Sequence, residues 1–345
     1  MNLKARIERA VARGVLRLPA TLQRWLVGAP LSLGGRTLDL QIQLLLKLRQ
    51  LGGTKPWQSY PLPRVRADFD VEAAMLAPAA PALAEMRGLE LAGAAGPIPA
   101  RLYRPAGLPA AAPCLVFYHG GGFTLGSLDS HDLPCRQLAA NTPCVVIAID
   151  YRLAPEHPFP AAADDALAAF HEVARRAAEL GVDAARIAVC GDSAGGNLAA
   201  VVAQDARQDA IAPCFQLLIY PTTDLTMSAE SIRTYGKGFL LEKTSMDWFR
   251  GNYLSPEQDR RHPRASPLFG DAQGVASALV ATAGFDPLCD EGQAYAQRMR
   301  EAGVAVQELF SEGLVHGYFN TSGAVHLAAE AGDQMIQALQ GAFRS

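Results

Sequence analysis

Past about Pro97, the chain alternates short apolar runs with segments long enough to form helices. The runs are rich in Val, Ile, Leu and Phe, as in parallel strands that are buried on both faces beneath crossover helices. We therefore expect an α/β fold whose mostly parallel central sheet begins near Pro97 and is flanked by helices. The predicted strands are Ile98–Tyr103, Cys114–Tyr118, Val145–Asp150, Ile187–Cys190, Phe215–Tyr220, Leu279–Ala283 and Val306–Phe310.

Helical patterns are visible in several segments. Between Asp164 and Leu180 the apolar residues share one helical face, and Gly181 offers a C-terminal stop. The stretch Ala324–Phe343 predicts a terminal helix. Residues 38–44 alternate with period two, but the apolar residues from 38 to 48 also fall on one helical face, and we favour a helix there.

Residues 1 to about 90 hold helical or ambiguous segments and proline-rich joints in place of the alternating pattern. Leu3, Ile7, Val11 and Val15 repeat every four residues among basic side chains, which predicts an amphipathic helix. Arginines at 9, 13 and 17 interrupt any signal-peptide core. We expect this helix to pack on a cap of the protein itself rather than on a membrane surface.

A second irregular stretch, between Thr222 and Pro267, mixes aromatic and charged residues. It interrupts the alternation between two predicted strands. An insertion at the ligand-binding side of a doubly wound sheet is well placed to cover a site. We expect this stretch to serve as a lid.

Composition excludes several classes of function. The formal net charge is −3, from 31 Lys and Arg against 34 Asp and Glu, so no basic field favours nucleic acid. No run approaches the roughly 18 uncharged apolar residues of a spanning helix, so stable membrane insertion is not expected. The six cysteines form no C-x-x-C pair and no zinc-ligand spacing. We therefore expect free thiols in a reduced, cytoplasmic protein that uses neither a metal nor another cofactor.

The sequence Gly191-Asp192-Ser193-Ala194-Gly195 matches the G-x-S-x-G nucleophile elbow. A predicted strand precedes it and an Ala- and Val-rich helical segment follows, which is the context that the motif requires. A serine in this turn must adopt strained backbone angles, where glycine at 191 and 195 avoids a collision. Ser193 is therefore the candidate nucleophile.

A glycine-rich turn, His119-Gly120-Gly121-Gly122-Phe123, follows the predicted strand that ends at Tyr118. Consecutive glycines free the backbone to turn N–H groups toward an oxyanion beside the serine, and the N–H of Ala194 can add a further donor. A plain flexible turn or a phosphate-binding loop are alternatives. The spacing fits neither G-x-G-x-x-G nor a Walker loop, so the pairing with the elbow favours the oxyanion role.

In hydrolases with such an elbow on a parallel sheet, an acid and then a histidine follow the serine. Asp286 follows one predicted strand and His316 follows the next, so both can meet Ser193 at the C-terminal edge. A neutral imidazole must take the serine proton, and a carboxylate must hold its tautomer. We therefore expect His316 to be the general base and Asp286 to orient it.

Other residues compete for these roles. His326 also follows Asp286, but it lies in the predicted terminal helix, which is a poor position from which to reach the sheet edge. Asp290 and Glu291 compete with Asp286, although they fall where a helix begins and therefore suit capping or orientation.

Taken together, these motifs resemble the hormone-sensitive lipase family, also called family IV of the bacterial esterases. The resemblance covers roughly residues 90 to 340. It also rests on Asp150–Glu156, which reads Asp-Tyr-Arg-Leu-Ala-Pro-Glu, on Asp-Pro-Leu-Cys-Asp-Glu from Asp286, and on His-Gly-Tyr from His316. It implies an α/β-hydrolase fold with a helical cap. It further implies an oxyanion hole formed by Gly120, Gly121, Gly122 and Ala194, with His119, Gly191, Asp192 and Gly195 as supporting motif residues.

The resemblance also has implications for domains and activity. It implies that residues 1–80 and 225–265 form the cap, on a catalytic domain of residues 81–345. Members of this family are mostly esterases for short acyl chains and are often homodimers. We therefore expect a serine carboxylesterase that hydrolyses short- to medium-chain esters of small molecules through an acyl-enzyme.

Alternative functions are weaker. An amidase or peptidase could use the same triad, and the resemblance rather than the residues favours an ester. A receptor branch that resembles this family lacks the catalytic histidine, whereas His316 is present here. A membrane-acting lipase would rest only on the basic N-terminal helix.

Overall fold

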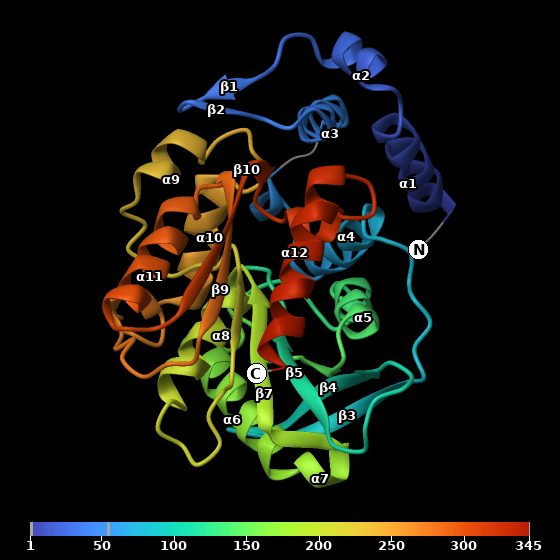
Figure 1. The fold of residues 1–345 in the computed structure, drawn as a ribbon. Coiled ribbons are helices and arrows are strands. Elements are labelled where there is room, and N and C mark those ends of the chain that lie inside the picture. Colours follow the sequence, from blue (N-terminus) through green and yellow to red (C-terminus); the bar gives the residue numbers. More distant parts are fainter. Residues whose placement is uncertain (1–2, 54–55, 345) are drawn as a thin grey trace.

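A sheet with eight strands in the order β10-β9-β8-β7-β5-β6-β4-β3 forms the centre of the computed structural model (Figure 1), which describes residues 3–53 and 56–344. The six strands β10, β9, β8, β7, β5 and β6 are parallel to one another, and β4 is antiparallel to both β3 and β6. The predicted α/β fold with a mostly parallel sheet is confirmed. The strands are β3 (Glu85–Gly93), β4 (Gly96–Arg104), β5 (Ala112–Tyr118), β6 (Val145–Ile149), β7 (Val182–Asp192), β8 (Gln216–Ile219), β9 (Ala278–Phe285) and β10 (Val306–Val315).

The prediction that the sheet begins near Pro97 is wrong, because β3 precedes it. β3 pairs antiparallel with β4 through a tight turn, with Gly93 opposite Gly96. It is an edge strand, and Leu91 is its only buried residue among the described side chains. An edge strand with one exposed face needs no continuous apolar run, so charged residues and glycine hide it from a search for such runs.

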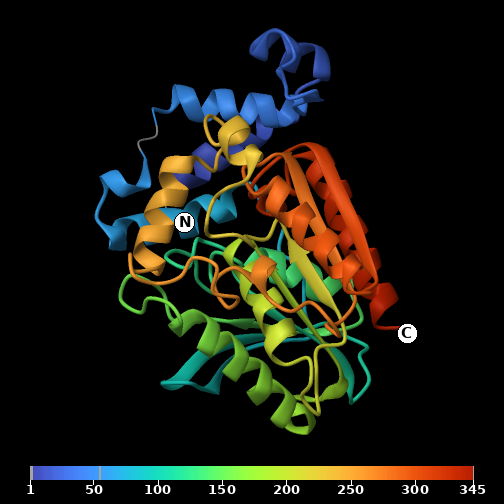
Figure 2. The same cartoon turned by 90° about the vertical axis from the view of Figure 1, so that its left-hand side faces the viewer.

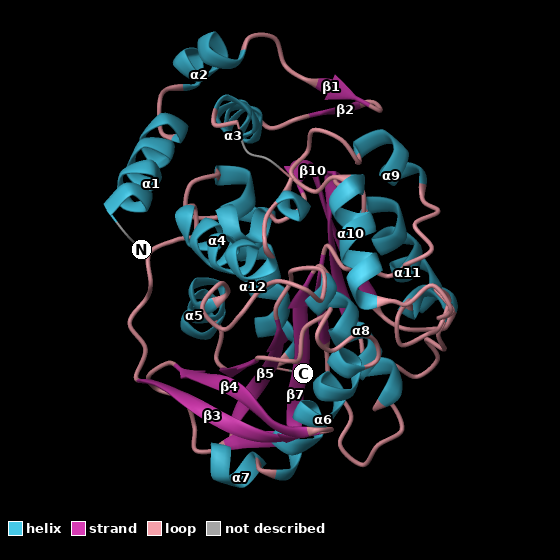
Figure 3. Cartoon of the chain, turned by 180° about the vertical axis from the view of Figure 1, so that it is seen from behind, coloured by secondary structure: helices cyan, strands magenta, loops and turns pink. Residues whose placement is uncertain are grey.

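Helices cover both faces of the sheet (Figures 1 and 3). One core cluster joins the sheet to α6, α8 and α11, and a second joins it to α5 and α12. In the fully buried strand β5, Val116 and Tyr118 belong to the first cluster while Leu115 and Phe117 belong to the second, as the two-residue period of a strand requires. These helices are α5 (Asp132–Asn141), α6 (Ala161–Arg175), α8 (Ala194–Asp205), α11 (Cys289–Glu301) and α12 (His326–Ala342).

Two helix predictions can be compared with the structure. The segment from Asp164 to Leu180 is helical but divides at Arg176 into α6 and the short α7 (Ala177–Leu180), which ends as predicted at Gly181 with φ +64°. The ambiguous segment near residue 40 is the helix α3 (Leu40–Leu51). Its start is set by Asp39, whose carboxylate accepts hydrogen bonds from the backbone N–H groups of residues 41 and 42.

The N-terminal helices α1 (Leu3–Leu16), α2 (Ala20–Val27) and α3 lie at one end of the sheet (Figure 1). The stripe predicted for α1 is wrong at Val11, which is 58% exposed. Val15 of that stripe packs in the cluster that joins α1 to α3, where the fully buried Leu16 lies as well. The side chains of Leu3 and Ile7 lie outside the described ones. Among the described residues, no helix has the length and apolar content needed to cross a membrane.

A further layer joins segments that are distant in sequence. The helices η1 (Trp57–Ser59) and α4 (Leu62–Met75) lie beside α10 (Lys243–Tyr253), and Figure 2 shows the gold α10 against the blue N-terminal segment. Their apolar side chains share one cluster with residues of α9 (Glu230–Tyr235). The remaining elements are β1 (Ser32–Leu33), β2 (Arg36–Thr37), η2 (Pro267–Phe269) and η3 (Tyr318–Thr321).

The packing of α3 predicts a contrast between two leucines on this helix. Leu44 is 2% exposed within the cluster that joins α1, α3 and α4, whereas Leu51 is 76% exposed. We expect Leu44→Ala to lower the free energy of unfolding by about 2–5 kcal/mol and Leu51→Ala to change it by less than about 0.5 kcal/mol. Denaturant titration of both variants measures the difference, and equal losses would show that α3 does not pack as described.

Candidate active site

Ser193 lies on the turn between β7 and α8, with a backbone φ of +56° and ψ of −117°. A positive φ is strained for a residue with a side chain, so the surroundings must hold it. The N–H of Ser193 donates to the carbonyl of Ile219 on β8 at 2.8 Å, and its carbonyl accepts from the N–H of Thr222 at 3.1 Å. The neighbouring strand therefore fixes the strained turn.

The glycines on either side of the turn have no space for a side chain. A Cβ at Gly195 would lie 1.9 Å from the carbonyl oxygen of Tyr118, and one at Gly191 would lie 2.3 Å from the carbonyl oxygen of Gly195. These obstacles are backbone atoms of β5 and of the turn itself, so they cannot move aside. The predicted reason for glycine at both positions agrees with these distances.

The structure brings Ser193, His316 and Asp286 together from three separate strand ends. Nε2 of His316 lies 2.9 Å from Oγ of Ser193, and Nδ1 lies 2.8 Å from Oδ2 of Asp286. Asp286 is fully buried, and its other oxygen, Oδ1, accepts from the N–H of Leu288 at 2.8 Å. The carboxylate is therefore held in one orientation, facing the imidazole.

This arrangement determines where the imidazole proton lies. A carboxylate accepts but does not donate, so the Nδ1–H of His316 must donate to Asp286. Nε2 then presents a lone pair to the hydroxyl of Ser193. The tautomer is the one that can remove a proton from the serine. Tyr220 packs against the imidazole, with 4.7 Å between ring centroids, and limits its movement.

The competing residues are engaged elsewhere. Oδ2 of Asp290 accepts from the N–H of Ser231 at 2.8 Å. Glu291 is buried, and its Oε1 accepts from the N–H of Thr223 at 2.7 Å, in the loop that follows β8. His326 is exposed at the start of α12. None of these contacts reaches Ser193.

The glycine turn after β5 divides into two functional parts. The N–H of Gly120 donates to Oδ1 of Asp192 at 2.8 Å and is therefore not free to bind a ligand. Gly121 and Gly122 have φ values of +123° and +61°. Among the described residues, none accepts a hydrogen bond from the N–H groups of Gly121, Gly122 or Ala194. The N–H groups of these three residues are therefore free to bind a ligand. The N–H of Gly120, which was also expected to line the oxyanion hole, is already bound to Asp192.

His119 supports this turn from inside the protein. Its ring stacks on Tyr151 with 4.3 Å between centroids, and Nδ1 lies 2.8 Å from the carbonyl oxygen of Gly120. Burial, together with the nearby His131, lowers the pKa of His119 to about 3. His119 is therefore neutral at ordinary pH and holds the glycine turn in place.

Sequence reasoning missed two residues at this site. Phe249 of α10 lies directly against the turn, because a Cβ at Gly122 would meet its ring at 2.3 Å. His131 precedes α5, and its Nε2 lies 3.1 Å from Oδ1 of Asp192. Phe249 lies in the stretch that was predicted to cover the site. No spacing or motif around His131 indicates that it lies beside Asp192.

Comparison with known proteins identifies the family. A family model described as alpha/beta hydrolase fold matches residues 115–320. The carboxylic ester hydrolase LipN of Mycobacterium tuberculosis is 42% identical over 342 residues, which cover 94% of this chain and 88% of LipN. The ethyl acetate hydrolase of Pseudomonas putida is 40% identical, over 87% of this chain and 96% of its own length.

Solved structures agree with this assignment. An ester hydrolase from the metagenome of Lake Arreo, solved with a bipyridine phosphonate derivative, is 40% identical with a TM-score of 0.85, over 89% of this chain and 100% of its own. An esterase from Pyrobaculum calidifontis is 38% identical with a TM-score of 0.82, over 91% and 99% of the two chains.

The burial of Glu291 predicts how the stability of the protein depends on pH. Burial raises the pKa of Glu291 well above its ordinary value, despite the hydrogen bonds that its carboxyl accepts from backbone N–H groups. The Glu291 carboxyl ionises at about pH 4.3 in the unfolded chain but stays protonated in the folded protein. The free energy of unfolding of the wild type should therefore fall as pH rises above about 4.3. We therefore expect Glu291→Gln to gain stability relative to wild type between pH 5 and pH 8, as measured by denaturant titration.

Glu179 provides the control of opposite sign. Its hydrogen bond with Arg176 lowers the pKa of this exposed carboxyl, so wild type should gain stability over Glu179→Gln as pH rises through the acidic range. A difference between wild type and Glu291→Gln that did not change with pH would contradict the assignment of a protonated, buried Glu291.

Proposed function

This chain belongs to the α/β-hydrolase family, in its hormone-sensitive lipase branch, and we propose that it is a serine carboxylesterase for short- to medium-chain esters of small molecules. The observation that carries the proposal is the unbroken line of contacts from Oγ of Ser193 through His316 to the buried Asp286. The relatives named above as ester hydrolases support the choice of an ester over an amide.

The proposed reaction begins with acylation of Ser193. Oγ attacks the ester carbonyl carbon as its proton passes to Nε2 of His316, and the carbonyl oxygen becomes an oxyanion. The free N–H groups of Gly121, Gly122 and Ala194 are the donors proposed to stabilise that charge. His316 then returns its proton to the alcohol oxygen, the C–O bond breaks, and the acyl group stays on Ser193.

Deacylation repeats these steps with water as the nucleophile. Water gives a proton to His316 and attacks the acyl carbon, and the proton returns to Oγ of Ser193 as the carboxylic acid leaves. The carboxylate of Asp286 stabilises the imidazolium form of His316. Each proton in this scheme passes between substrate, water, Ser193 and His316, so the proposed reaction uses no cofactor.

We also propose that residues 1–80 and 225–265 form a cap over this site. Phe249 lies against Gly122, and its ring is 5.6 Å from that of Trp57, from the N-terminal part of the chain. Both segments contribute to one apolar cluster beside the glycine turn. The cap would therefore line the acyl-binding side with aromatic groups and limit the length of the acyl chain. A homodimer and a cytoplasmic location remain predictions.

A series of p-nitrophenyl esters with increasing acyl length tests the function. We expect kcat/KM to be highest for short to medium chains and to fall for long ones, because aromatic side chains close the proposed pocket. In Ser193→Ala the activity should fall at least about 10³-fold, as on removal of other triad residues. Retention of more than a tenth of the activity by this variant, with contamination excluded, would reject Ser193 as the nucleophile.

Asp286→Asn and Asp290→Asn form a matched pair. We expect Asp286→Asn to lower kcat by about 10⁴-fold, because an amide can hold the wrong imidazole tautomer and cannot stabilise imidazolium. Asp290→Asn should leave kcat near wild type, since the carboxylate of Asp290 accepts from Ser231 and not from His316. Steady-state kinetics of both proteins decide the matter, and the reverse order of losses would show that Asp286 is the wrong carboxylate.

A further inference from the structure

His131 is a buried histidine for which the proposed reaction has no use. It lies in the residue before α5, and its side chain is 1% exposed. One ring nitrogen, Nε2, lies 3.1 Å from Oδ1 of Asp192, and the other, Nδ1, lies 2.8 Å from Oγ of Ser130. The ring also lies 5.6 Å from that of His119, between centroids. His131 therefore lies behind the glycine turn, in the interior of the protein.

The contact with Asp192 determines which nitrogen of His131 carries a proton. If Nε2 carried no proton, its lone pair would face the carboxylate oxygen of Asp192 and repel it. Nε2 therefore carries a proton that faces Oδ1 of Asp192. Nδ1 is held by the hydroxyl of Ser130, which lies 2.8 Å away and is itself 2.9 Å from the carbonyl oxygen of Ser127.

The attraction between His131 and Asp192 is electrostatic rather than a well-aligned hydrogen bond, because Nε2 of His131 has no partner in hydrogen-bonding geometry among the described residues. The properties of Asp192 agree with this description. Burial alone would raise its pKa, but His131 and the N–H of Gly120 outweigh burial and lower it.

Asp192 connects this contact to the glycine turn. The same oxygen, Oδ1, that faces His131 accepts from the N–H of Gly120 at 2.8 Å. Gly120 approaches so closely that a Cβ there would lie 2.5 Å from Oδ2 of Asp192. Because Gly121 follows Gly120 directly and Ser193 follows Asp192 directly, this hydrogen bond links the segment that carries the free donors to the segment that carries the nucleophile.

We infer that His131 is a positioning residue for the oxyanion donors, which it orients by holding the Asp192 carboxylate on the N–H of Gly120. This inference rests on the proposed function, since it assigns His131 a part in the same reaction. His131 does not touch the substrate. It acts through Asp192 and the glycine turn.

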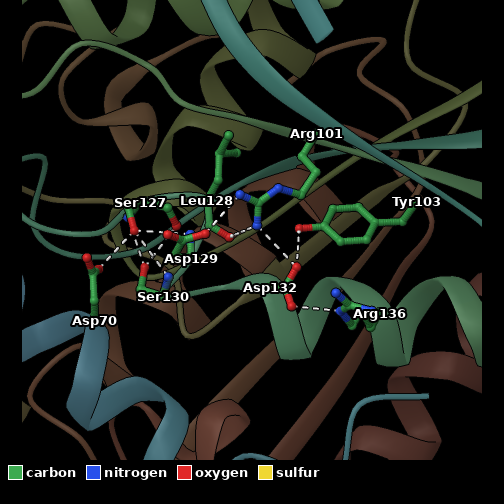
Figure 4. Close-up of polar contacts among 9 residues, drawn as sticks. All are labelled: Asp70, Arg101, Tyr103, Ser127, Leu128, Asp129, Ser130, Asp132 and Arg136. Carbon is green, nitrogen blue, oxygen red and sulfur yellow. Dashed lines mark hydrogen bonds and ion pairs between the residues drawn. The ribbon is translucent and has the colours of Figure 1, made fainter. Parts of the chain in front are cut away.

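The loop that carries His131 is itself firmly held (Figure 4). Arg101 of β4 binds the carbonyl oxygen of Leu128 at 3.2 Å and the carboxylates of Asp129 and Asp132 at 2.8 and 3.2 Å. These contacts anchor both sides of His131 to the sheet.

The same loop also reaches the N-terminal layer. The hydroxyl of Ser127 donates to Asp70 of α4 at 2.9 Å and accepts from the N–H of Ser130 at 3.1 Å. Figure 4 shows Asp70 pointing from its helix toward Ser127. His131 is therefore fixed from the sheet on one side and from α4 on the other, so its position relative to Asp192 is well defined.

The test compares His131→Leu with His131→Gln in the full-length protein. Leucine removes both ring nitrogens, whereas the glutamine amide can still donate to Asp192. We expect His131→Leu to lower kcat by about 10²-fold, the cost of misplacing one set of oxyanion donors, with KM within about threefold. His131→Gln should recover at least a tenth of the wild-type kcat.

Binding of an alkyl boronic acid supplies the second readout. It forms a tetrahedral adduct on the serine and so probes the oxyanion donors, and its affinity for His131→Leu should fall by the same factor as kcat. His171→Gln is the control, because His171 forms an exposed pair with Asp209 at 2.7 Å and should behave as wild type. A rise in KM alone, an unchanged kcat, or unchanged boronate affinity in folded His131→Leu would overturn the inference.

Two further outcomes are decisive. If His131→Leu does not fold, His131→Asn carries the test, since its amide is too short to reach Asp192. If neither variant folds, the role of His131 is structural and the inference fails. A wild-type protein without Ser193-dependent esterase activity would instead reject the proposed function, so the two failures are distinguishable.

Discussion

The close contact between the turn at Ser193 and the end of β5 is the constraint on which the site depends. The Cα of Gly195 approaches the carbonyl of Tyr118 so closely that a Cβ would lie 1.9 Å from that oxygen. Because Tyr118 is followed directly by His119 and the glycine turn, the same contact sets the nucleophile and the free N–H donors beside each other. The strain of a positive φ at Ser193 is the cost of this geometry.

Buried charge makes the arrangement rigid. Asp286 and Asp192 are both buried carboxylates, and each has an imidazole on one side and a backbone N–H to accept from. An unpaired charge at either position would be very costly, so each imidazole and N–H must stay in place for the fold to hold its carboxylate. Asp286 faces the imidazole of His316, and Asp192 faces the N–H of Gly120 at the start of the glycine turn.

Local sequence patterns were enough to predict much of the candidate site. The rest depends on contacts between residues that are distant in the sequence. The elbow and the order of Ser193, Asp286 and His316 could be predicted because parallel strand ends meet at one edge of a sheet. The loss of Gly120 as a donor could not, since it depends on the orientation of Asp192. His131 was missed for the same reason. β3 was missed because a half-exposed edge strand carries no apolar run.

Covalent labelling of Ser193 tests the central claim most directly. A fluorophosphonate should react once per chain with the wild-type protein, and peptide mapping after intact-mass analysis should place the adduct on Ser193. His316→Ala should label far more slowly, because the serine loses the base that accepts its proton. An adduct on another residue, or labelling of His316→Ala at the wild-type rate, would contradict the account of an activated Ser193.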